Sequence, residues 1–126
     1  ALSKEEQKKG KRVLRFLEKC RKVVSEGEGA TDSFGLLSAY YGQAVEGLKK
    51  NTQRTSERLH NVFNFVAKAF EEGNEMLLFV TELTVSGHGA GYIAAFGSSD
   101  YQKYSSELML GERKDQILQE IKELNL

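Results

Sequence analysis

The chain has 126 residues, of which 40% are hydrophobic and 29% are charged, and its formal net charge at pH 7 is zero. This length and composition are typical of one globular domain that buries its own core without metal ions or disulfide bonds. No run of about 18 apolar residues occurs, which excludes a transmembrane helix.

Three features bear on where such a chain works. The single cysteine, Cys20, cannot form an internal disulfide bond, which favours a reducing compartment. The first eleven residues, ALSKEEQKKGK, lack the apolar core of a signal peptide. The sequence begins at Ala1 instead of a methionine, so we expect either a processed start or, as the favoured reading, a piece excised from a longer chain. Together these features favour a domain of a cytoplasmic, bacterial, multidomain protein.

Residues 3–25 are expected to form the first helix. Ser3 and Glu6 have the spacing of a capping box, in which each side chain satisfies a free backbone amide. Apolar residues then recur at spacings of three and four, which places them on one helical face: Val13, Phe16, Leu17, Cys20 and Val24. Gly10 weakens the early turns by about 1 kcal/mol relative to alanine. We therefore expect residues 1–10 to fray or to form a separate turn.

Two further helices are expected over residues 34–50 and 55–72. The glycine-rich stretch 26–35 predicts a loop before them, and Asn51, Thr52 or Thr55 can cap the second. The second is the clearest helix of the chain, and Gly73 follows it as a stop. Its apolar face contains Leu59, Val62, Phe63, Val66 and Phe70, and Phe65 and Ala69 are expected to widen that face.

Residues 74–96 read as a fully buried strand or as a helix buried nearly all round. The helix is favoured because it places Glu82 on a narrow polar seam with Glu75 and Ser86. A last helix is expected from residue 98 or 99 to residue 124, with a bend or break near Gly111. The complete pattern predicts an all-α fold, a single domain spanning residues 1–126. It is a compact bundle of about five helices, with a central apolar helix near residues 74–96.

The charge is distributed unevenly. Residues 1–22 contain nine basic and three acidic residues, a net charge of +6, while the rest of the chain contains nine basic and fifteen acidic residues. Such asymmetry can mark an arm that faces nucleic acid or a membrane. The lysines look spread around the helix and no aromatic stripe accompanies them, which favours a basic helix lying on an acidic body.

The glycine cluster Gly87–Gly91 is a candidate phosphate-binding loop. Gly87 and Gly89 fit the first two positions of a dinucleotide fingerprint, but Tyr92 stands where the third glycine is needed, and no Walker lysine follows. Ser86 and His88 lie two residues apart and point away from each other on a helix, which argues against a nucleophile and its base. One cysteine and two histidines give no metal-ligand spacing. We expect no cofactor, no metal site and no catalytic residues.

Candidate contact residues are basic side chains with interleaved tyrosines, which can stack on single-stranded bases or dock a protein. They are Lys8, Lys11, Arg12, Arg15, Lys19, Lys49, Lys50, Arg54, Arg58, Tyr40, Tyr41, Tyr101 and Tyr104. The favoured function is a non-catalytic interaction domain that docks other domains of its parent chain or a protein partner. The alternatives are a nucleic-acid-binding accessory domain that uses the basic first helix, and a small nucleotide-binding enzyme built on Gly87–Gly91. The sequence does not define an oligomeric state.

Overall fold

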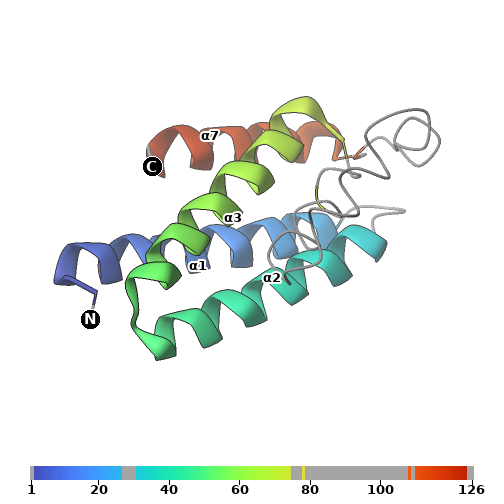
Figure 1. Cartoon of the computed structure of the whole chain (residues 1–126). Helices are drawn as coiled ribbons and strands as arrows, with labels where there is room; N and C mark the ends of the chain where they lie inside the picture. Colours follow the sequence, from blue (N-terminus) through green and yellow to red (C-terminus); the bar gives the residue numbers. More distant parts are fainter. Residues whose placement is uncertain (1, 27–30, 75–77, 79–107, 109, 125–126) are drawn as a thin grey trace, which may run out of the picture.

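A computed structural model describes residues 2–26, 31–74, 78, 108 and 110–124 (Figure 1). These residues form four α-helices: α1 (Lys4–Ser25), α2 (Thr31–Lys50), α3 (Gln53–Glu72) and α7 (Lys114–Leu124). A 3-10 turn, η1 (Gly111–Arg113), precedes α7. The expected all-α class is confirmed for this part of the chain, with four helices in place of about five. The helix expected near residues 74–96 lies outside the described residues, except for Asn74 and the buried Leu78.

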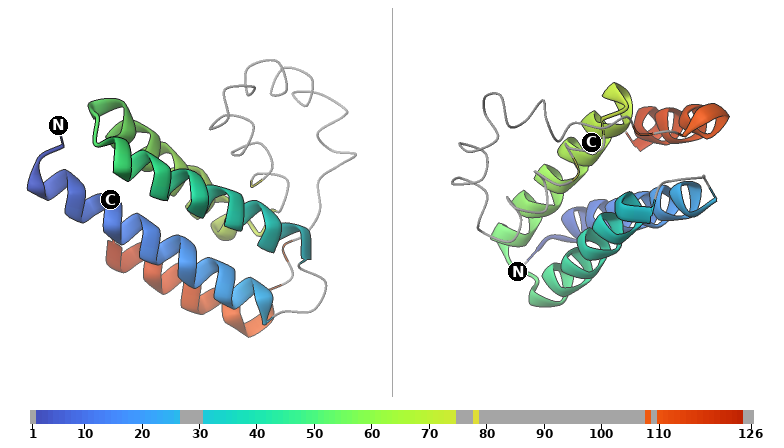
Figure 2. Two further views of the ribbon diagram at one scale, coloured as in Figure 1. Left: turned by 90° about the horizontal axis from the view of Figure 1, so that it is seen from below. Right: turned by 90° about the vertical axis from the view of Figure 1, so that its right-hand side faces the viewer.

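Helix α1 packs on α2, α3 and α7, and most extensively on α2 (Figures 1 and 2). All five residues predicted for its apolar face are buried. The Phe16 ring meets the Phe63 ring of α3 edge to face, with 5.1 Å between the ring centroids. This geometry suits the quadrupoles of two aromatic rings. The core of the described residues is therefore organised around the inner face of α1.

The beginning of α1 is well anchored. The capping box is present: Ser3 Oγ accepts a hydrogen bond from the Glu6 amide, and Glu6 accepts one from the Ser3 amide. Leu2 is buried, and its amide donates to Asn51 Oδ1 over 2.9 Å. The expectation of a frayed or separate segment over residues 1–10 is wrong for residues 4–10, because α1 runs through Gly10 without a break.

Gly10 explains why that expectation failed. It is buried, and a Cβ atom placed there would lie 2.6 Å from Cδ2 of Leu48 and 3.1 Å from Cδ1 of Leu59. The glycine therefore lets α1 approach the turn between α2 and α3, where a larger side chain would collide. Tertiary contact outweighs the low helix propensity of glycine at this position.

The other helix ends follow the expected signals, but α2 and α3 begin three and two residues earlier than expected, at Thr31 and Gln53. Thr52 caps α3, and Gly73 ends it in the left-handed region with φ of +64°. Gly111, with φ of +57°, marks the expected break before α7. Helix α2 begins at Thr31, so residues 31–35 are helical and the predicted loop is shorter than expected. Phe65 was expected to widen the buried face of α3, but it is 37% exposed, because α3 turns that side away from the other described helices.

Candidate nucleic-acid interface

The outer side of α1 carries a continuous row of cations. Positions 4, 8, 11, 15 and 22 follow one another at intervals of three, four or seven residues, and positions 12 and 19 lie one step aside. At about 100° per residue, all seven fall within an arc of roughly 100°. We call these residues the basic stripe: Lys4, Lys8, Lys11, Arg12, Arg15, Lys19 and Lys22.

The stripe arises because the inner face of α1 is fully used by the core. The buried side chains point toward α2, α3 and α7, so the charged ones are confined to the remaining side of the helix. Six of the seven stripe residues are exposed, and Arg12 is half-buried. Five of the six lysines of α1 therefore lie within the stripe, while the exposed Lys9 lies roughly 60° outside it at about 100° per residue. This clustering removes the main reason for regarding this helix as an inert basic surface.

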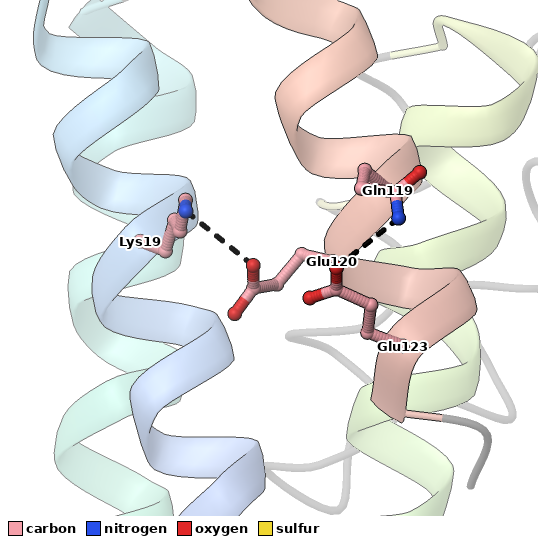
Figure 3. A network of polar contacts seen from close by, with 4 residues as sticks. All are labelled: Lys19, Gln119, Glu120 and Glu123. Carbon is pink, nitrogen blue, oxygen red and sulfur yellow. Dashed lines mark hydrogen bonds and ion pairs between the residues drawn. The ribbon is translucent and has the colours of Figure 1, made fainter.

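Most of the stripe is electrostatically unsatisfied within the described part of the chain. Lys19 forms an ion pair with Glu120 of α7 over 3.4 Å, and Figure 3 shows this carboxylate reaching across from α7 to α1. The neighbouring Glu123 instead accepts a hydrogen bond from Gln119 on its own helix. None of the other six stripe residues forms an ion pair with a described residue.

The stripe runs along most of the length of α1. From Lys4 to Lys22 it covers about 27 Å along the helix axis, at 1.5 Å per residue. Glu5 and Glu18 flank its two edges, each roughly 20° outside the arc at about 100° per residue, and no acidic residue of α1 lies within it. A flexible lysine or arginine side chain at each turn or half-turn can contact successive phosphates of a strand laid along the helix.

A second basic cluster lies apart from the stripe. Lys50, Arg54 and Arg58 line a groove of about 580 Å³ between α2 and α3, whose walls include the apolar Leu59 and Val62. The described lining contains no residue of α1, so the structure does not join the two basic regions into one surface. Lys49, the fourth candidate of this region, pairs with Glu46 over 3.4 Å.

The candidate tyrosines are less accessible to a ligand or partner than the basic candidates. Tyr40 is fully buried and belongs to the core, so its ring offers no surface for a base or a partner. Tyr41 is half-buried, and the Arg21 guanidinium lies over its ring at 5.1 Å from the centroid. Tyr101 and Tyr104 lie outside the described residues. The described residues therefore give the tyrosine-bearing docking face little support.

One aromatic that sequence reasoning overlooked lies beside the stripe. Phe34 of α2 is 37% exposed, and Arg21 of α1 covers its ring at 5.4 Å from the centroid. Arg21 is held there by a 3.1 Å hydrogen bond from its Nε to Ser38 Oγ. Position 34 lies four residues before Ser38 and seven before Tyr41, so the sequence already placed these three on one face of a helix. It gave no sign that an arginine of α1 would pack on them.

Phe34 opens on a hollow at the carboxyl end of α1. This hollow has a volume of about 740 Å³, and its walls include Arg15, Lys19 and Lys22 of the stripe together with Gln116 of α7. We call it the Phe34 hollow. The acidic Glu18 and Glu26 also line it, and Glu26 is engaged by Arg113 over 3.7 Å.

Metal-ligating and nucleophilic side chains were also candidates for a chemical site. No three histidine, cysteine, aspartate or glutamate side chains among them lie close enough to hold a metal ion. Burial raises the pKa of the Cys20 thiol well above its ordinary value, and the Glu120 carboxylate adds to this shift, so the thiol is protonated and unreactive near neutral pH. His60 is exposed on α3. Gly87–Gly91, Ser86 and His88 lie outside the described residues.

None of the described helices combines the length and the apolar character that a membrane span requires. No protein-family model matches the sequence, and no curated protein or solved structure shows significant similarity to it. Function must therefore be argued from the surface itself.

Proposed function

We propose that this chain is a non-catalytic binding domain whose basic stripe binds the phosphate backbone of a nucleic acid. The observation that carries the proposal is the gathering of seven cations on one side of α1, six of them without an ion-pair partner among the described residues. An ordinary solvated helix face interleaves both signs of charge, whereas acids are missing from this arc. A polyanion with regularly spaced charges is the ligand that complements such a row.

The proposal predicts the dependence of affinity on salt. Each phosphate that a cation neutralises releases counterions, so the logarithm of the binding constant falls linearly with the logarithm of the salt concentration. With six available cations the slope reaches about −4 to −5 at most, at roughly 0.7 to 0.9 per phosphate contact. Fluorescence anisotropy of a labelled oligonucleotide, titrated with the full chain at several salt concentrations, measures this slope.

A matched pair of triple variants tests which surface binds. The first changes Lys8, Lys11 and Arg15 of the stripe to glutamine; the second changes Lys50, Arg54 and Arg58 of the groove to glutamine and removes the same net charge. The stripe variant is expected to lose affinity and to flatten the salt slope by about two to three, while the groove variant retains both. Equal losses in the two variants, or no binding by the native chain at low salt, would refute the proposal.

A second function is favoured by the groove between α2 and α3. Its volume lies in the range of ligand sites, and its three cations form no ion pair with a described residue. Gln43 on its wall has a buried Oε1 without a hydrogen-bond partner among the described residues, which a donor from a partner can satisfy once the side chain turns. An acidic segment of a protein partner, or of another domain of the parent chain, fits this combination. Calorimetric titration of both triple variants with an acidic peptide tests this second function. The groove variant should lose affinity for the peptide, while the stripe variant should keep it.

A further inference from the structure

We propose that the Phe34 hollow receives an unstacked base, so that the stripe binds single-stranded nucleic acid in preference to a duplex. This inference rests on the proposed function, because it assigns the form of nucleic acid that the same surface takes. Phe34 is one of two large hydrophobic side chains exposed among the described residues, and it is the one that adjoins the stripe.

The position of the ring is fixed before any ligand arrives. Arg21 covers it from α1 at 5.4 Å, and the same guanidinium is held by Ser38 and by the Tyr41 ring. A ring held in this way loses little conformational freedom when a base stacks on it, and the guanidinium beneath it extends the stack. The exposed remainder of the ring faces the hollow, which is where a base must enter.

Three stripe cations line the hollow together with the acidic Glu18 and Glu26, of which Glu26 is paired with Arg113. Arg15, Lys19 and Lys22 line the hollow and also belong to the stripe. A strand that follows the stripe by its phosphates therefore passes the hollow, and one of its bases can turn toward Phe34. In a duplex the bases are already stacked and paired, so the ring can reach a base only by opening the helix. Aromatic stacking combined with a basic track is the usual means of binding single strands without reading their sequence.

Phe65 provides an internal control. It is exposed to the same extent, 37%, but it lies on α3 and lines neither the Phe34 hollow nor the groove. Phe34→Ala is expected to weaken single-strand binding by about 5- to 150-fold, the range measured for the loss of one base–aromatic stack. Phe65→Ala is expected to change it less than about twofold. Neither substitution should change duplex binding or the salt slope, because both leave the cations in place.

A fluorescence experiment tests the stack directly. The chain contains no tryptophan, so Phe34→Trp and Phe65→Trp each introduce a single probe at a known position. Saturable quenching of the Phe34→Trp emission by a short oligothymidylate, with little change in Phe65→Trp, would support the proposal. Equal responses of the two probes, or native binding to duplex that is as tight as binding to single strand, would overturn it.

The two proposals fail in different ways. If the stripe triple variant loses binding while Phe34→Ala and Phe65→Ala behave alike, the stripe binds nucleic acid but the hollow does not receive a base. If the native chain binds no oligonucleotide at low salt, both proposals are refuted. Far-UV circular dichroism and thermal unfolding of each variant establish that the comparisons are made on folded protein, since Phe34→Ala also removes the ring that packs against Arg21.

Discussion

Replacing Gly10 by alanine tests how closely α1 packs against the turn between α2 and α3. Alanine stabilises a helix interior by about 1 kcal/mol relative to glycine. At Gly10 this gain is opposed, because the new Cβ would lie 2.6 Å from Cδ2 of Leu48 and 3.1 Å from Cδ1 of Leu59. Carbon atoms pack best at about 3.5 to 4.0 Å, so Leu48 must move by roughly 1 Å.

The control for this change is Gly42→Ala. Gly42 also lies in a helix interior, and nothing approaches within 4 Å of the Cβ position there. It should therefore gain the full helix-propensity term of about 1 kcal/mol. Both close contacts are with the methyl ends of leucine side chains, which can shift, so Gly10→Ala is expected to be less stable than Gly42→Ala by about 1 kcal/mol, the lower end of the cost of inserting a methyl group into a packed site.

Urea-induced unfolding followed by far-UV circular dichroism measures both free energies of unfolding. Because the chemical change is identical at the two sites, the difference between the two free energies of unfolding measures the cost of packing at Gly10. If Gly10→Ala stabilises the chain as much as Gly42→Ala, α1 does not approach Leu48 as closely as described. Gly10→Val extends the test, because its larger side chain should raise the cost further.

Two further predictions concern a helix end and the buried thiol. Gly73→Ala should lower the free energy of unfolding by about 1 to 2 kcal/mol, because φ is +64° there and L residues avoid this region; an unchanged urea midpoint would contradict the left-handed cap. Cys20 should react with a thiol reagent only as fast as the chain unfolds, since its side chain is fully buried; rapid native labelling would contradict this. The raised pKa of Cys20 means that the folded state favours the neutral thiol. Its contribution to the free energy of unfolding is therefore fully present below the ordinary pKa of 9.0. Above that pH, as the thiol of the unfolded chain ionises, the contribution falls by about 1.4 kcal/mol per pH unit. Unfolding curves of the native chain and Cys20→Ala should therefore diverge in alkaline solution, and parallel curves would count against the shift.

The local signals in the sequence predicted the helix ends well. The capping box at Ser3 and the stop at Gly73 are present, and Thr52, one of the three residues considered as the cap of α3, caps it, because each signal depends on residues within one turn of the helix end. The apolar faces of α1 and α3 were predictable for the same reason. Predicting such a face requires only the helical spacing of the apolar residues and the assumption that some neighbour covers it.

The sequence predictions were wrong at positions whose structure depends on contacts between helices. Gly10 looked like a weak point because the sequence does not show Leu48 approaching it. Phe65 looked like a core residue because periodicity does not show how far the neighbouring helices extend around α3. The pairing of Arg21 with Phe34 joins residues on different helices, so only the packing of α1 on α2 shows it. The basic stripe is different, because intervals of three, four and seven were visible in the sequence.

Repulsion between the cations of the stripe destabilises α1, which indicates that these charges serve a purpose other than stabilising the fold. Like charges three or four residues apart destabilise a helix by a few tenths of a kcal/mol per pair, and Lys8, Lys11 and Arg15 form two such pairs. Only Lys19 is compensated by an acid of another described helix. The cost is tolerated because α1 draws its stability from an inner face packed against three helices. Neutralising those three residues should therefore leave the fold at least as stable while weakening the binding of a polyanion, as expected if the charges serve binding and not the fold.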